Sequence, residues 1–88
     1  MPPLEIPPRF KKALRKKDAS MQGRILECVA RLQTNPRHPG LQVHKMKGHD
    51  GIWEAYVDAK NRVTFCVEGD AIVMLNHCNH DFLFRNPR

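Results

Sequence analysis

An α+β fold is predicted for this 88-residue chain, with two N-terminal helices packed on one face of a mostly antiparallel sheet of four to five strands. Three observations predict it. Apolar residues recur at helical spacing in the first third of the chain. From residue 41 onwards, apolar and polar residues alternate in several short segments. Short turns join these segments, which favours antiparallel neighbours.

The first two elements are a short extended segment and a basic helix. Leu4–Ile6 lies between prolines, which strands tolerate at sheet edges, so an edge strand or an extended entry is expected. Residues 9–17 carry Phe10, Ala13 and Leu14 at helical spacing, with Lys or Arg on the remaining faces. The segment is therefore predicted to be an amphipathic helix.

A second amphipathic helix is predicted after a tight turn. Asp18 can accept a hydrogen bond from the first free amides of this helix, and Pro36 bounds its far end. Its apolar stripe consists of Met21, Ile25, Cys28, Val29 and Leu32.

Four later segments are predicted strands, at residues 41–47, 53–57, 62–67 and 71–76. The last is apolar on both faces, as expected of a strand at the centre of the sheet. The side chains expected to face the helices are Trp53, Ala55, Val57, Val63, Phe65 and Val67.

In that register, Glu54, Tyr56 and Arg62 share the other face of the sheet, which is expected to be left uncovered by helices. A substrate or partner would lie there. A shift of one residue in the register would reverse the assignment, because successive side chains of a strand point to opposite faces.

The chain is strongly basic, with 15 Lys and Arg against 9 Asp and Glu and a net charge of +6. Such a charge favours a polyanion as partner, because neutralised phosphates release counterions. A solvated positive surface and an acidic protein partner remain as alternatives. Three cysteines without paired spacing fit a reducing cytosol, and we expect neither a signal peptide nor a membrane-spanning segment, because no apolar run has the required length. We expect one cytoplasmic domain over residues 1–88.

The densest polar cluster is the segment 76–81, which contains two histidines. Histidine suits proton transfer near neutral pH, so His80 or Glu54 could act as base or acid on a ribose 2′-hydroxyl and a leaving 5′-oxygen. Arg62 could stabilise the charge that develops on phosphorus. His77 and Asp81 could orient His80, and Tyr56 would lie beside them.

Each of these residues has a purely structural alternative. Asp81 could cap a short terminal helix, and Glu54 and Arg62 could form only a cross-strand ion pair. Phe84 could stack on a base or cover the core. No metal is expected, because His and Cys crowded within five residues do not match a known paired ligand spacing.

The basic residues fall into two groups. Lys45, Lys47 and Arg85 lie around the sheet and are expected to hold an RNA backbone near His80. The lysines and arginines of residues 9–17 form either a solvated helix face or a second contact with a large RNA.

The sequence also resembles RelE/ParE-type bacterial toxins, in order over nearly the whole chain. The segments that carry the resemblance are Pro8-Arg9-Phe10-Lys11-Lys12, His44-Lys45-Met46-Lys47-Gly48, Gly51-Ile52-Trp53-Glu54, Arg62-Val63-Thr64-Phe65 and His80 to Arg85. The resemblance implies a short first strand, two helices and an antiparallel sheet. It also implies a toxin that a cognate antitoxin neutralises.

The functional positions depart from RelE. Where RelE carries basic residues on the strand matching 52–57, this chain has Glu54 and Tyr56, whereas Arg62 matches an arginine of the family. A glutamate, arginine and histidine set is similar to YoeB-like toxins, and His80 with Phe84 is similar to YafQ.

The resulting prediction is a metal-independent endoribonuclease toxin without a cofactor. It would cleave mRNA, in association with the ribosome, and inhibit translation. A ParE-like DNA gyrase inhibitor and a non-catalytic member that binds only RNA or antitoxin are the alternatives.

Overall fold

The computed structural model describes residues 2–88, except for the side chains of Asn79, His80, Asp81 and Phe84. The candidate site residues His80, Asp81 and Phe84 therefore lie outside the described side chains. The elements are β1 (Leu4–Glu5), α1 (Pro8–Arg15), α2 (Ala19–Thr34), the 3₁₀ helix η1 (Pro39–Leu41), β2 (His44–Lys45), β3 (Trp53–Tyr56), β4 (Asn61–Glu68), β5 (Ala71–Asn79) and α3 (His80–Arg85).

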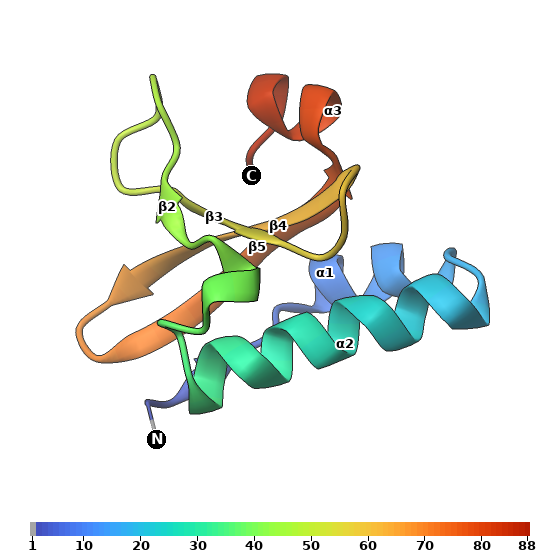
Figure 1. Cartoon of the computed structure of the whole chain (residues 1–88), viewed down its shortest axis with the longest axis horizontal. Helices are drawn as coiled ribbons and strands as arrows, with labels where there is room; N and C mark the ends of the chain where they lie inside the picture. Colours follow the sequence, from blue (N-terminus) through green and yellow to red (C-terminus); the bar gives the residue numbers. More distant parts are fainter. Residues whose placement is uncertain (1) are drawn as a thin grey trace.

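Five strands form one sheet in the order β1-β5-β4-β3-β2. The pairs from β2 to β5 are antiparallel, and the short β1 runs parallel to β5. In Figure 1, α1 and α2 lie on one side of the sheet and α3 lies on the other. The predicted α+β architecture, with two helices on one face of a mostly antiparallel sheet, is confirmed.

The N-terminal helices form where the sequence predicts them. Pro8 stands in the first turn of α1, where a missing amide proton costs nothing. The Asp18 side chain accepts a hydrogen bond from the Met21 amide at 2.8 Å and caps α2, as expected. Among the described residues, no helix is long and apolar enough to cross a membrane.

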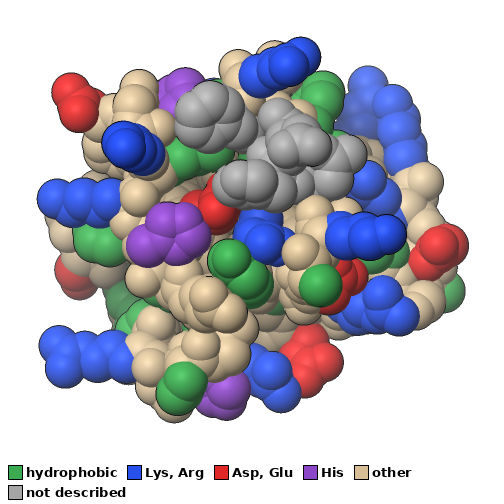
Figure 2. Space-filling model, turned by 45° about the horizontal axis from the view of Figure 1, so that its top comes forward, with side chains coloured by type: hydrophobic (Ala, Val, Ile, Leu, Met, Phe, Trp, Pro, Cys, Tyr) green, Lys and Arg blue, Asp and Glu red, His purple; other side chains and the backbone are tan. Residues whose placement is uncertain are grey.

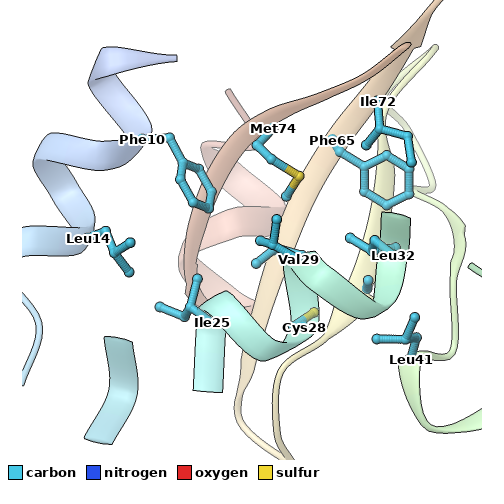
Figure 3. Packing of buried hydrophobic residues seen from close by; sticks show 12 residues of the cluster. Phe10, Leu14, Ile25, Cys28, Val29, Leu32, Leu41, Phe65, Ile72 and Met74 are labelled. Carbon is cyan, nitrogen blue, oxygen red and sulfur yellow. The ribbon is translucent and has the colours of Figure 1, made fainter. Parts of the chain in front are cut away.

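The main core lies between the two helices and the sheet (Figure 3). Ala55, Val63 and Phe65 are buried there, and Trp53 and Val57 pack against them, so the predicted register is right. Val67 lies opposite Ile72 of this core, on the predicted face, but it is near the end of β4 and its side chain is exposed.

The predicted strand 41–47 was too long. Pro39 and Gly40 start the 3₁₀ helix η1, and Gln42 has a left-handed backbone with φ of 45°. Leu41 enters the core at the end of this turn. The chain can therefore become extended only after Gln42, and β2 is limited to two residues.

The face expected to be uncovered is partly covered. A second apolar cluster on that side joins Met46 and Ile52 to Leu83 of α3. The segment after α3 crosses the sheet, where Thr64 donates a hydrogen bond to the Pro87 carbonyl and Asn76 donates one to the Asn86 carbonyl. Among the described side chains of α3, Leu83 is the one that joins this cluster, and a single apolar residue gives no periodic pattern from which sequence analysis could place the helix.

Candidate functional site

The candidate site is built on three neighbouring strands. His44 of β2 lies opposite Glu54 of β3, and Glu54 lies opposite Thr64 of β4. Tyr56 and Arg62 form the next cross-strand pair. Because side chains alternate along a strand, these residues face away from α1 and α2, toward the side that carries α3.

A carboxylate and an imidazole form the first part of the site. Oε1 of Glu54 lies 3.2 Å from Nε2 of His44, and Nδ1 of His44 lies 2.6 Å from the Gln42 carbonyl oxygen. Both ring nitrogens thus face oxygen atoms that can accept a hydrogen bond. The ring is held in place from both ends, yet the His44 side chain is 49% exposed.

Arg62 forms the second part. Its guanidinium carbon lies 3.4 Å from the centroid of the Tyr56 ring, and Nη1 donates hydrogen bonds to the carbonyls of Asp58 and Asn61 at 2.7 and 3.0 Å. Nε lies 4.0 Å from Oε1 of Glu54, too far for a hydrogen bond but close enough for electrostatic attraction. Stacking and hydrogen bonds therefore fix this cation.

The turn between β3 and β4 supports that position. Asp58 accepts hydrogen bonds from the amides of Lys60 and Asn61 at 2.9 and 2.8 Å. Burial opposes ionisation of Asp58, but the Lys60 amide, the Asn61 side chain and amide, and Arg24 outweigh it, so the pKa of this carboxyl is lowered. The ordered turn presents the carbonyls that bind Arg62.

Burial separates the roles that these residues can take. Glu54 is only 1% exposed and Arg62 is 6% exposed, whereas half of the His44 side chain reaches the surface. A substrate can touch His44 directly. Glu54 faces that surface through His44, whose ring it orients.

Comparison with known proteins places the fold. No known family model and no curated protein sequence matches the chain. Solved structures do match. A YoeB/ParE toxin from Agrobacterium tumefaciens is 17% identical with a TM-score of 0.71, and the match covers 89% of this chain and 98% of that chain. YafQ from E. coli strain BL21(DE3) is 16% identical with a TM-score of 0.71 (96% of this chain, 99% of that chain), and a chain of the archaeal RelE–RelB complex from Pyrococcus horikoshii OT3 is 22% identical with a TM-score of 0.69 (88% of this chain, 92% of that chain). The chain has the RelE-like fold.

Within this RelE-like fold, His44 is the site residue that sequence analysis missed. It stood inside a predicted strand and inside one of the segments that resemble the toxins. Its pairing with Glu54 depends on the register between β2 and β3. The turn at residues 46–52 sets that register, and its geometry is not encoded in a periodic pattern.

Two predicted residues lie on the other side of the RelE-like sheet. His77 was expected to support His80, but it lies opposite Val63 of the core. Its ring contacts the Phe10 ring edge to face, with the ring centroids 4.6 Å apart. Burial lowers the pKa of His77 and nearby Lys17 adds to this effect, although a hydrogen bond to the Phe10 carbonyl opposes it. Lys45 lies opposite Trp53, with its amine 5.6 Å from that ring, so it points away from Glu54.

The remaining predicted residues lie around the site or outside the described side chains. Lys47 is exposed in the turn after β2, and Arg85 is exposed at the end of α3. Figure 2 shows the face that carries α3, where basic, acidic and histidine atoms lie close together near the middle and further Lys and Arg side chains lie around the margin. The side chains of His80, Asp81 and Phe84 are not described. Among the side chains that are described, no three His, Cys, Asp or Glu residues gather as a metal site would require.

Proposed function

We propose that this chain is the toxin of a type II toxin–antitoxin pair and a metal-independent endoribonuclease that cleaves mRNA. The observation that carries the proposal is the half-exposed His44, held between a backbone carbonyl and the buried Glu54 beside Arg62. A positioned imidazole next to a fixed cation is what transfer of a phosphoryl group between ribose oxygens requires.

In the proposed reaction, the ribose 2′-oxygen attacks the adjacent phosphorus, and the bond from phosphorus to the 5′-oxygen breaks. The products are a 2′,3′-cyclic phosphate and a 5′-hydroxyl. His80 takes the proton of the 2′-hydroxyl. The departing 5′-oxygen replaces the Gln42 carbonyl as the partner of Nδ1 of His44 and receives the proton of that nitrogen, while Nε2 stays on Glu54. The buried charge of Arg62 stabilises the negative charge on the phosphoryl oxygens through space, without direct contact.

Glu54 is proposed as a positioning residue. Its carboxylate, 3.2 Å from Nε2 of His44, holds the ring in the orientation that proton transfer to the leaving group needs. Lys47 and Arg85, exposed around the site, would contact the RNA backbone. Phe84 would stack on a base.

The proposed partners are a cognate antitoxin, mRNA and the ribosome, in the cytoplasm. Solved structures with the same fold include the DinJ–YafQ complex and the intact RelBE toxin–antitoxin complex, both from E. coli. A net charge of +6 supports both an acidic antitoxin segment and RNA as ligands.

The test is cleavage of mRNA by the purified protein in chelator, with and without ribosomes, by wild type, His44→Gln, Glu54→Gln and His80→Ala. We expect His44→Gln and His80→Ala each to lower the rate constant by about 10²-fold or more. Glu54→Gln should lower it less and shift the pH profile, because it acts through His44. His38→Asn is the matched control: it removes a histidine whose ring accepts from the Gly40 amide, a bond that Asn can replace.

Cleavage at the wild-type rate by both His44→Gln and His80→Ala would refute the proposed site, and loss of cleavage in chelator would refute metal independence. Growth arrest without RNA cleavage, but with a DNA damage response, would point instead to a gyrase inhibitor of the ParE type.

A further inference from the structure

An open pocket of about 490 Å³ lies on the α1 side of α3, away from the Glu54 site. Its wall on one side is the basic face of α1, its floor is the C-terminal part of β5, and its other wall is α3. The residues that line it are Arg9, Lys12, Lys16, Lys17, Asn76, His77 and Phe82. Its volume is in the range of small-ligand sites.

Three lysines of this pocket have no ion-pair partner among the described side chains, whereas Arg9 donates a hydrogen bond to the Arg88 carbonyl oxygen at 2.8 Å. Lys12 and Lys16 are four residues apart and share one face of the α1 segment, where like charges repel each other. Among the described side chains, neither these two nor Lys17 forms an ion pair, and no carboxylate lines the pocket. Such a surface is stabilised when an anion binds to it.

The floor of the pocket is an exposed stretch of strand edge. β1 pairs with β5 only at Ile72 and Val73, so in the described structure the later part of β5 has no strand neighbour on this side. Asn76 and His77 form the floor there. Burial lowers the pKa of His77, so the floor is uncharged at neutral pH and the positive charge stays on the rim.

The wall contributed by α3 is aromatic. Phe82 is 47% exposed, one of few large apolar side chains at the surface of the described structure. A cationic rim opposite an exposed ring matches the two parts of a nucleotide, since phosphate binds Lys and a base stacks on an aromatic side chain. An acidic peptide would use the rim but not the ring.

We propose that this pocket binds one nucleotide of single-stranded RNA, with its phosphate on Lys12 and Lys16 and its base against Phe82. The α3 helix packs on β5 and β4, so it lies between this pocket and the site on β3 and β2. β5 and β3 are two strand spacings apart, about 10 Å, and an RNA strand that occupies both places would pass around α3. The inference rests on the proposed function only in naming RNA as the nucleic acid.

The experiment measures binding of a fluorescent 2′-O-methyl RNA dodecamer, which lacks the attacking hydroxyl, by fluorescence anisotropy at several salt concentrations. The variants are Lys12→Gln/Lys16→Gln and Phe82→Leu. The matched control is Lys11→Gln/Arg15→Gln, which removes two charges from exposed positions of the same helix that do not line the pocket. Circular dichroism establishes that each variant is folded.

We expect the Lys12→Gln/Lys16→Gln variant to bind the RNA about 25-fold more weakly at 0.1 M salt. The slope of the logarithm of the association constant against the logarithm of the salt concentration should become less steep by about 1.4, the effect of two lost phosphate contacts. Phe82→Leu should weaken binding about fivefold or more with an unchanged slope. The control should stay close to wild type.

Equal weakening by the control pair would overturn the proposal, because it would show only a general effect of net charge. If the Lys12→Gln/Lys16→Gln variant lost binding to a polyglutamate peptide but still bound RNA, the proposal would be overturned in favour of an acidic protein partner. Competition by millimolar AMP with wild type, and none with the Lys12/Lys16 variant, would support nucleotide chemistry at this pocket. Because the probe cannot be cleaved, a failure of the proposed ribonuclease activity would leave these results unchanged.

Discussion

Truncation of Leu83 tests whether α3 is attached to the face of the sheet that carries the site. Leu83 is fully buried, and it completes a cluster with Met46 and Ile52, against which Leu75 and Cys78 pack. Leu83→Ala removes buried carbon atoms at a position that α3 cannot easily fill from elsewhere. The turn between β2 and β3 loses part of its apolar support in the same step.

The expected loss follows from burial. A fully buried leucine replaced by alanine costs about 2–5 kcal/mol, and the lower half of that range fits a cluster near the surface that can partly collapse. We expect a decrease of about 2–3 kcal/mol in the free energy of unfolding. The free energy of unfolding of a domain of this size is about 5–15 kcal/mol, so the variant should still fold.

The assay is equilibrium unfolding in urea, followed by circular dichroism, with Leu26→Ala as matched control. Leu26 lies on α2 and is 48% exposed, so its truncation should change the free energy of unfolding by about 0.5 kcal/mol or less. Equal midpoints for Leu83→Ala and wild type would refute the packing of α3 on the sheet.

Two further predictions concern His77 and Asp18. Burial lowers the pKa of His77 from its usual 6.5, so below that pH the unfolded chain binds a proton that the folded chain excludes. The free energy of unfolding should therefore fall with decreasing pH, by at most about 1.4 kcal/mol per pH unit. The fall should be less steep in His77→Gln, and urea unfolding at several pH values between about pH 5 and pH 8 measures it. Asp18→Ala removes the hydrogen bond to the Met21 amide and should destabilise the chain by about 1 kcal/mol, whereas Asp18→Asn should retain most of the stability.

The sequence was sufficient to predict the fold because local patterns and global packing agree. Phe10 and Leu14 on α1 and the stripe of α2 that includes Val29 and Leu32 meet the inward residues of β3 and β4 in one core. The alternation that places Ala55 in this core places Glu54 on the opposite face. That part of the site required only the period of two along a strand.

The rest of the site depends on features that no period reveals. His44 reaches Glu54 because a tight turn pairs a two-residue strand with β3. His77 reaches the helix face because the register between β4 and β5 shifts near Thr64, so side chains before and after the shift do not follow one alternation. A continuous alternation drawn through β5 therefore could not assign a face to His77.

The position of Glu54 within the sheet connects the fold to the proposed chemistry. The Glu54 side chain is buried, with Oε1 3.2 Å from Nε2 of His44 and 4.0 Å from Nε of Arg62, and buried ion pairs of this kind can often be replaced by apolar residues without loss of stability. The stability of the sheet therefore does not explain why a carboxylate lies there. What the carboxylate does provide is a fixed negative charge 3.2 Å from a surface imidazole, and that imidazole is the group of the cluster that a substrate can reach. The buried pair of Glu54 and Arg62 is accordingly better explained as the support of His44 than as a stabilising element of the fold.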